Sequence, residues 1–501
     1  MTKHQISEPT TFVGEWCLPS DEKNLQKIPG TLSWSIQRAS LELHDSFNPL
    51  CGSVYGDETH SYPVIHGTTV QSQYVTLLKT LRTGNNLSFG PAGLRQPEKL
   101  VSSWVIVGAH VDDQTLYSEI RVRIPGLQMW LCRSGVEQTI LHKTQGKAAG
   151  VVYRIDAMEE ERHEISSLQT VLGWGIDRHF SGDLTTNISV ITSACLRIQS
   201  EKPQPLDWFF EQLGKATTLL AFLAGSPMAP DQISAKVAEV DIEVDVLVAL
   251  REAKYCIHKK ISDFYMLRSS MEIDLGIVFS KWYEIYDTIA MPSQLALSVL
   301  SSEDLWLHIE FLSLMQALEG FHRATMTGLY TSEEAYESIK KTLSNSIPNT
   351  VGSDHKEALK SRIRYGNEIS LRKRLDALIS RLDLPLRKQI LGNDGVVPRS
   401  WVVTRNYYTH WDNESRDHIL DGVEMHRAGV RMRHLLRALY LDFVGIPQTA
   451  IAKALVNTCK ESQYLIQLNN AEIRKRHPEE AIQPMMYIGV RDPESPDESQ
   501  G

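Results

Sequence analysis

The spacing of hydrophobic residues divides the chain into a β-rich first part and a helical last part. Over residues 1–205, short runs alternate apolar and polar residues or are rich in β-branched residues, with turn residues between them. Because neighbouring side chains of a strand point to opposite faces, this period predicts strands with one buried face. Examples of the predicted strands are residues 10–17, 30–36, 69–77, 101–107, 118–124 and 150–155, and residues 187–198 are the last strand of this region. They predict a β-sandwich or an open barrel, and they leave the strand order open.

The hydrophobic period lengthens after residue 205. An apolar helix is predicted over residues 208–223, where Gly225 and Pro227 end it. A strand-like stretch over 236–250 and a second helix over 275–290 follow. We interpret residues 206–295 as a mixed connector.

The last third of the chain has helical periodicity. Its strongest helix is predicted over residues 304–323, because apolar residues recur there at every third or fourth position. Capping patterns beginning at Thr331 and Asp354 predict two further helix starts. Other helices are predicted over residues 369–382, 401–411, 418–444 and 450–468. The sequence therefore predicts an α+β chain with an all-α bundle over 296–477 and a polar, partly disordered tail over 478–501.

Composition indicates a soluble protein of several domains. The 501 residues are 42% hydrophobic and 23% charged, which are ordinary values for globular chains. No apolar run reaches about 18 residues, and the first residues lack the apolar core of a signal peptide. The six cysteines are scattered without a CxxC pair, which predicts reduced thiols in a cytoplasmic protein. Motifs for nucleotide, dinucleotide or zinc binding are missing from the sequence, so no cofactor and no metal are expected.

Positive charge is concentrated in the helical region. The whole chain has a formal net charge of −9. Residues 355–441 hold 17 Lys and Arg against 10 Asp and Glu, a difference of +7, which leaves −16 for the remainder. A basic segment on an acidic protein favours selective contact with phosphate groups. The alternative is a set of solvated helix faces.

One hexapeptide in the basic region combines a permanent cation, an amide and a titratable base. It contains Arg405, Asn406 and His410 in the order Arg405-Asn406-Tyr407-Tyr408-Thr409-His410, within a predicted helix. Asn406 and His410 are four residues apart and share a helical face. Arg405 and His410 lie about 140° apart around the helix axis, although the long arginine side chain can turn towards the imidazole.

This combination of side chains fits metal-independent cleavage of RNA. RNA carries its own nucleophile, the 2′-hydroxyl group, so a base must remove that proton and an acid must protonate the leaving oxygen. Histidine can serve in either role near neutral pH, and a guanidinium can stabilise the charge on the phosphate oxygens. From spacing alone, a solvated or paired Arg and His on an ordinary helix is the alternative interpretation.

The helical region resembles the HEPN superfamily, whose members carry an Arg-x(4–6)-His motif, often with a polar residue after the arginine. The helix around 311–323, the β-rich region before it and the hexapeptide about 80 residues later are together similar to the ApeA-type HEPN proteins of bacterial phage defence. The resemblance implies a metal-independent endoribonuclease with Arg405 and His410 as catalytic residues. It also implies a homodimer or higher homo-oligomer through the bundle, products with 2′,3′-cyclic phosphate and 5′-hydroxyl ends, tRNA among the candidate targets and a phage-derived trigger.

Several other residues are candidates for supporting roles. Glu319 lies where such bundles hold a polar residue near the motif, and we expect it to orient His410 or to pair with Arg405; an exposed acid is the alternative. Tyr408, like Tyr407, is a candidate for stacking on RNA bases, although tyrosines at such positions more often fill a helical core. Two arginines of the long helix, Arg431 and Arg433, are candidates for phosphate contacts. A non-catalytic scaffold is the alternative function.

Overall fold

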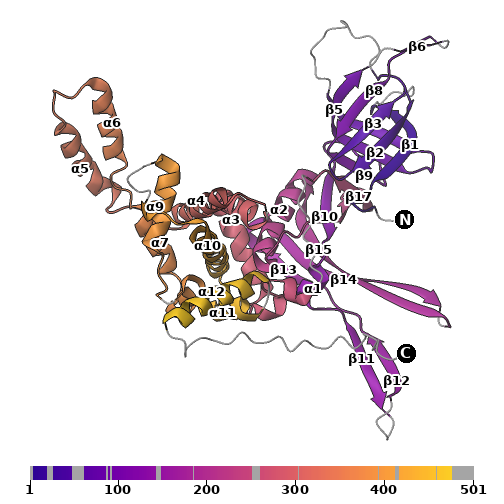
Figure 1. Cartoon of the computed structure of the whole chain (residues 1–501). Helices are drawn as coiled ribbons and strands as arrows, with labels where there is room; N and C mark the ends of the chain where they lie inside the picture. Colours follow the sequence, from indigo (N-terminus) through magenta and orange to yellow (C-terminus); the bar gives the residue numbers. More distant parts are fainter. Residues whose placement is uncertain are drawn as a thin grey trace, which may run out of the picture. The chain divides into compact units, whose positions relative to one another are not determined.

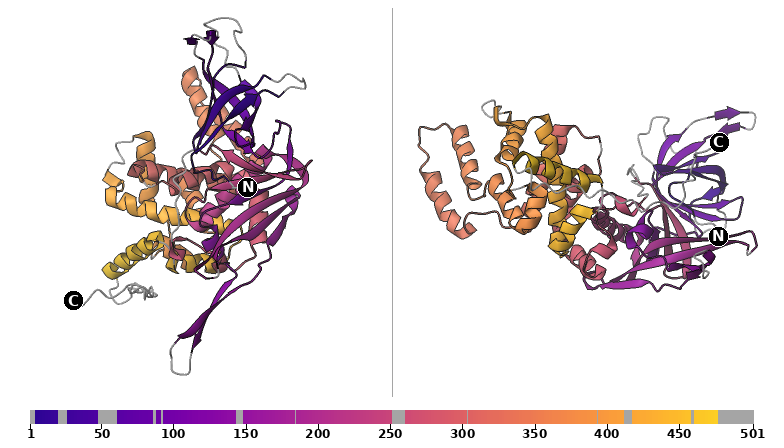
Figure 2. Two further views of the ribbon diagram at one scale, coloured as in Figure 1. Left: turned by 90° about the vertical axis from the view of Figure 1, so that its right-hand side faces the viewer. Right: turned by 60° about the horizontal axis from the view of Figure 1, so that its bottom comes forward.

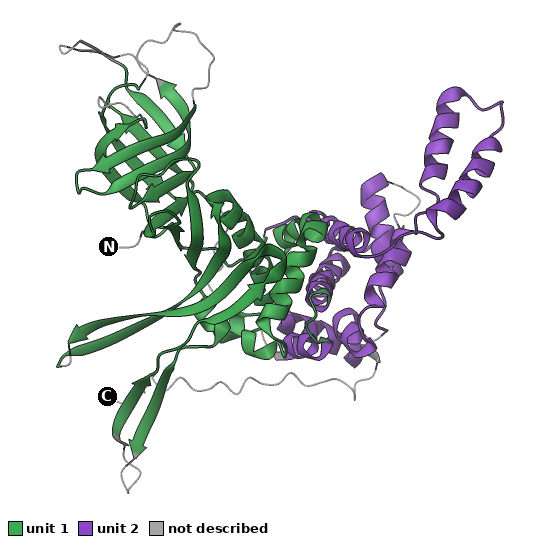
Figure 3. Ribbon diagram, turned by 180° about the vertical axis from the view of Figure 1, so that it is seen from behind, with its two compact units in different colours: residues 1–303, 443–447 green, residues 304–442, 448–501 purple. Residues whose placement is uncertain are grey.

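The computed structural model describes residues 4–19, 26–47, 61–85, 88–90, 93–142, 148–183, 185–250, 260–302, 304–392, 394–411, 417–457 and 460–476. The chain forms two compact units (Figure 3). The first comprises residues 1–303 with 443–447, and the second comprises residues 304–442 with 448–501.

The first unit begins with a closed barrel of antiparallel strands (Figure 1). The ring runs β1–β2–β3–β8–β5–β4 and returns to β1, so each strand has a partner on both sides. Residues along β2 alternate between buried and more exposed positions, as the sequence period predicts. Gly67 is required on β4, because a Cβ atom there would collide with the ring of the buried Trp16. The strands are β1 (Thr10–Cys17), β2 (Ile28–Ser35), β3 (Arg38–Leu43), β4 (Ser61–Thr69), β5 (Tyr74–Asn85) and β8 (Glu98–Ser102).

One buried carboxylate stabilises the barrel at the start of β8. Glu98 is fully buried and forms an ion pair with Arg82, with 3.1 Å between Oε1 and Nε. The hydroxyl groups of Tyr62 and Ser46 and the backbone N–H of Phe47 donate hydrogen bonds to the same carboxylate. Burial, followed by the neighbouring Glu98, raises the pKa of Tyr62 to about 12.

Replacing Glu98 with alanine should destabilise the protein by about 3–5 kcal/mol, because the Arg82 charge would lose its buried partner. The measurement is the urea midpoint of unfolding of the full chain. Glu42→Ala is the matched control on β3, since Glu42 and its partner Lys99 are both more than half exposed, and this change should cost less than about 1 kcal/mol. Equal midpoints for the two variants would contradict the role given to Glu98.

The remainder of the sheet continues from the barrel through β5. It runs β9–β17–β16–β10–β15–β14–β13, with antiparallel pairing throughout. Residues 206–295, expected as a connector, instead supply two central strands and two helices of this unit. The added strands are β9 (Trp104–Val107), β10 (Leu116–Arg123), β13 (Glu161–Ile165), β14 (Thr170–Asp183), β15 (Asn187–Pro205), β16 (Gln232–Val237) and β17 (Ile242–Val248).

Three α-helices lie in the described part of the first unit, and several of their aromatic residues are buried in its core. Trp174 of β14 contacts Trp130 of α1 and Phe279 of α3, and Phe222 of α2 contacts Trp282 of α3. The helices are α1 (Leu127–Leu131), α2 (Leu206–Ala224) and α3 (Leu275–Leu300). Two long hairpins, β14–β15 and β11–β12, extend away from this core (Figure 2). The remaining strands are β6 (Ser88–Gly90), β7 (Gly93–Arg95), β11 (Val136–His142) and β12 (Ala148–Ile155).

The second unit is helical. Its central helix, α10, is buried along most of its length, and Tyr440 of α10 packs against Phe321 of α4 at 4.6 Å between ring centroids. Ser332 begins α5 by accepting a hydrogen bond from the backbone N–H of Ala335. The helices are α4 (Leu307–Thr325), α5 (Glu333–Asn345), α6 (Ser353–Arg364), α7 (Leu371–Ile379), α8 (Leu384–Leu391), α9 (Arg399–His410), α10 (Gly422–Phe443), α11 (Gln448–Asn457) and α12 (Lys460–Arg476).

The predicted α+β class with a β-rich first part and a helical last part is confirmed. The single helix predicted over 450–468 is instead the two helices α11 and α12, and α8 had no counterpart among the predictions. Cys17, Cys132 and Cys195 are free thiols. No helix among the described residues is long and apolar enough to cross a membrane. The tail predicted over 478–501 lies outside the described residues.

Candidate functional site

Helix α9 carries the Arg–His motif on its last two turns. Trp401 and Thr404 are buried and anchor the helix, and the Thr404 hydroxyl accepts a hydrogen bond from the backbone N–H of Leu420 at 2.9 Å. Asn406 and His410 are exposed, whereas Arg405 is half-buried. The helix therefore fixes one side of the motif in the bundle and leaves its polar groups open to solvent.

The Arg405 guanidinium is held in place by two acceptors. Its Nη2 donates to Oε2 of Glu319 on α4 at 3.2 Å, and its Nη1 donates to Oδ1 of Asn406 at 3.2 Å. The Arg405 side chain is 23% exposed and that of Glu319 is 12% exposed. A guanidinium has five N–H donors, so these two bonds leave donors for a bound anion. Of the two roles expected for Glu319, the structure contains the pair with Arg405.

Glu319 also belongs to a longer series of alternating charges. Its Oε1 pairs with Arg323 at 3.1 Å, Arg323 pairs with Glu368 at 2.8 Å, and Glu368 pairs with Arg374 at 2.9 Å. With Arg405, the series contains three guanidiniums and two carboxylates, which gives a net charge of +1. Sequence reasoning missed this series, although the spacing of Glu319 and Arg323 by four residues is typical of a helical ion pair.

A buried histidine ends the series. His322 is fully buried, and its Nδ1 accepts a hydrogen bond from Nη1 of Arg374 at 3.2 Å, because an arginine can only donate. Burial lowers the pKa of His322, and the charges of Arg374 and Arg323 lower it further. Both the lowered pKa and the role of Nδ1 as an acceptor favour the neutral ring.

Aromatic side chains surround the motif. Tyr408 stacks on His308 of α4, with 5.9 Å between ring centroids and 19° between ring planes. Tyr407 contacts both Tyr408 and Trp411 through its ring. Both tyrosines are half-buried, so each retains an accessible edge. Trp411 and His308 were not among the residues selected from the sequence.

The two arginines of α10 proposed as RNA contacts are engaged within the bundle. Arg431 is 5% exposed and donates to the Ile390 carbonyl, to Asn469 and to Glu472 at 2.7–2.9 Å. Arg433 pairs with Glu310 at 2.6 Å. Helical spacing suggested two outward-facing cations, but α10 is surrounded by other helices, so these side chains stabilise the fold.

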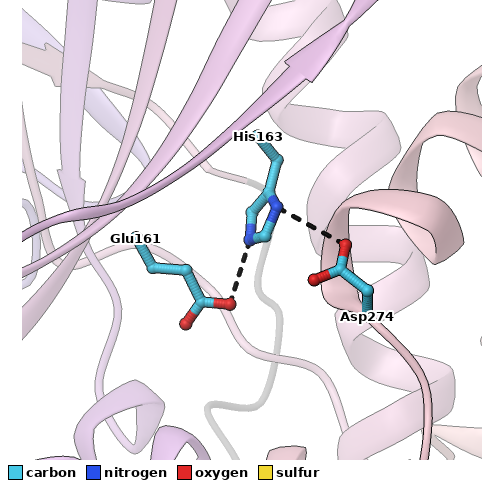
Figure 4. A group of neighbouring side chains, drawn as sticks. All are labelled: Glu161, His163 and Asp274. Carbon is cyan, nitrogen blue, oxygen red and sulfur yellow. Dashed lines mark hydrogen bonds and ion pairs between the residues drawn. The ribbon is translucent and has the colours of Figure 1, made fainter.

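A second polar cluster lies in the first unit, where His163 stands between two carboxylates (Figure 4). Its Nε2 is 3.0 Å from Glu161 and its Nδ1 is 3.6 Å from Asp274, which also caps the N-terminus of α3. One ligand atom from each of the three residues lies within 4.8 Å of the others, a spacing that a shared metal ion could span, but both ring nitrogens of His163 already face the acids. Glu161 also pairs with Arg133 and Arg268, each at 3.1 Å. We interpret the cluster as an electrostatic link between β13 and α3.

This link predicts an acid-sensitive contribution to stability. Burial alone would raise the pKa of Glu161, but hydrogen bonds and charge from Arg268 and His163 lower it below its usual value. A lowered pKa stabilises the folded state above the unfolded pKa, and this contribution disappears as the pH falls through the folded pKa. Glu161→Gln should therefore cost about 1–3 kcal/mol near neutral pH and progressively less below about pH 4. Urea unfolding of both proteins at several pH values measures this difference; a pH-independent difference would contradict it.

Comparison with protein families agrees with this architecture. The family model described as ApeA N-terminal domain 1 matches residues 11–282, and the model described as Apea-like HEPN matches residues 312–450. The second match contains Glu319, Arg405, Asn406 and His410. No curated protein and no solved structure has significant similarity to the chain.

The helical unit is therefore a HEPN domain. The β-rich part of the chain before it matches the ApeA N-terminal domain 1. The chain belongs to the family of ApeA-type HEPN proteins. HEPN domains are generally ribonucleases, and the two matches together fit a HEPN-based defence protein.

Proposed function

We propose that this protein is a metal-independent endoribonuclease of antiviral defence, with Arg405 and His410 as its catalytic residues. One observation carries the proposal: Glu319 and Asn406 orient a half-buried guanidinium on the same two helical turns that present an exposed imidazole. A helical scaffold without chemistry would not require an arginine with spare donors on the same two helical turns as an accessible histidine.

The chemistry follows from these groups. His410 removes the 2′-hydroxyl proton or protonates the leaving 5′-oxygen, and Arg405 stabilises the negative charge that gathers on the phosphate oxygens. Asn406 lies on the same face as His410 and can contact a phosphate oxygen or the imidazole. Attack by the internal 2′-hydroxyl forms a 2′,3′-cyclic phosphate and releases a 5′-hydroxyl end.

A homodimer would bring an arginine and a histidine from different subunits to one phosphate. Arg405 and His410 lie five residues apart on one helix and so diverge by about 140°. Two copies of the motif facing each other would place one subunit's arginine beside the other subunit's histidine. We propose that the bundle pairs in this way, that tRNA is a candidate substrate, and that a phage component releases the activity.

The direct test is incubation of the purified protein with total RNA in the presence of EDTA. The proposal expects cleavage under these conditions, with fragments whose 5′ ends a kinase can phosphorylate without prior phosphatase treatment. Cleavage that requires added metal, or 5′-phosphate ends, would exclude the mechanism. Retention of phage protection by both Arg405→Ala and His410→Ala would favour the non-catalytic scaffold instead.

A further inference from the structure

Aromatic rings form a connected series beside His410. Trp411 directly follows His410, and its ring centroid lies 6.3 Å from that of Tyr408. Tyr408 stacks on His308, which in turn lies 6.4 Å from Trp306 at the start of α4. We call these four side chains, Trp306, His308, Tyr408 and Trp411, the aromatic platform. Both α4 and α9 belong to the second unit.

The two ends of the aromatic platform are unusually open to solvent. Trp306 is 76% exposed and Trp411 is 69% exposed. A tryptophan that faces water leaves a large apolar surface uncovered, which opposes folding stability. A single exposed aromatic residue is ordinary, but here two of them end one series of ring contacts.

Trp411 also occupies a strained backbone position. It ends α9 with φ 53° and ψ 40°, in the left-handed region. Glycine or asparagine is usual at this position, and a bulky residue there is an outlier. The indole therefore contributes neither to the core nor to a relaxed helix end. Residues that violate local preferences in this way concentrate at functional sites.

The surroundings of the aromatic platform indicate the ligand. Flat rings are exposed beside two imidazoles, His308 and His410, and the Arg405 guanidinium belongs to the same helix. A nucleotide offers a flat base for the rings and a phosphate for the guanidinium. Bases inside a duplex are stacked on one another, so an accessible base must be unpaired.

We propose that the aromatic platform stacks an unpaired base next to the phosphate that is cleaved, which makes the substrate single-stranded or looped RNA. The inference rests on the proposed ribonuclease function and deepens it. It adds Trp306, His308 and Trp411 as positioning residues, and Trp306 and His308 precede the part of the chain that matches the HEPN family.

The test measures RNA binding without cleavage. In the His410→Ala background, fluorescence anisotropy compares a single-stranded oligoribonucleotide of about 12 nucleotides with its duplex. Adding Trp411→Asn should weaken single-strand binding about fivefold to a hundredfold and leave duplex binding unchanged. Because asparagine tolerates the left-handed conformation, this variant should unfold at no lower urea concentration than its parent. The control is Tyr365→Asn, which alters another aromatic residue that is 60% exposed in the same unit and should not change binding.

Three outcomes would overturn the inference. They are unchanged single-strand affinity in Trp411→Asn, equal losses for single strand and duplex, and a shift from dimer to monomer in sedimentation, which would assign the aromatic platform to self-association. Failure of the ribonuclease proposal is recognised separately, because the protein with His410 would then leave RNA intact whatever the binding result.

Discussion

Replacing His410 with alanine should lower the rate of RNA cleavage by about a hundredfold to ten-thousandfold, because the reaction loses a proton-transfer group. The fold should be unaffected, since His410 is exposed at the last position of α9. The measurement is the single-turnover rate on one RNA substrate.

The matched control for this change is His355→Ala. His355 is an exposed histidine on α6 of the same unit, and its removal should leave the rate unchanged. A His410→Ala protein that cleaves as fast as His355→Ala would remove His410 from the mechanism.

Mixed dimers test whether the two motifs share one active site. When Arg405→Ala and His410→Ala subunits combine, one of the two shared sites recovers an intact arginine and an intact histidine from different subunits. Activity should then return to as much as about half of the wild-type rate, taking each composite site as independent. Mixtures that stay as inactive as the separate variants would place both residues in one subunit.

The second large effect is expected at Arg405. Arg405→Ala should lower the rate of RNA cleavage about a hundredfold to a thousandfold. Other enzymes lose rate to this extent when one hydrogen-bond donor to a charged transition state is removed. Arg405→Lys should recover only part of the rate, because an ammonium group cannot reproduce a planar pair of donors. Single-turnover rates at saturating RNA separate this effect from weaker binding.

Glu319 should act on the reaction through Arg405. Glu319→Gln keeps an acceptor but removes the charge that pairs with Arg405 at 3.2 Å, so its rate should fall between those of wild type and Arg405→Ala. When Glu319→Gln and Arg405→Ala are combined, the cleavage rate should fall no further than it does in Arg405→Ala alone. Arg399→Ala is the control, since this exposed arginine begins the same helix and should not affect cleavage. Additive losses would show that Glu319 acts independently of Arg405.

Local periodicity predicted most of the helices and some of the strands, but it could not predict which strands pair with one another. The strand predicted over 10–17 matches β1, and the helix predicted over 401–411 differs from α9 by two residues at its start and one at its end. The barrel closes because β8 pairs with both β3 and β5, and such pairing depends on contacts far apart in the sequence. Residues 206–295 were interpreted as a connector for the same reason, because β16 and β17 pair with strands more than 100 residues earlier.

Prediction of the candidate active site was also limited by contacts between residues far apart in the sequence. The hexapeptide was apparent because its residues lie on adjacent helical turns. Glu368 and Arg374 escaped notice because they reach Arg323 and His322 from another part of the unit, 45 and 52 residues along the chain. Arg431 was misjudged because its helix is enclosed on nearly every side, and an enclosed helix buries residues that helical spacing assigns to solvent.

The strand order sets the sequence in which the chain can fold as it leaves the ribosome. All six strands of the barrel have been synthesised once residue 102 has emerged, so the barrel can close early. β9 and β10 emerge soon afterwards, but the strands that lie between them, β16 and β17, end only at residue 248. At about 5–20 residues per second, the exposed strand edges wait about 7–30 s for their partners. A nascent chain interrupted in this interval would present unpaired strands, so chaperone binding during synthesis should concentrate there.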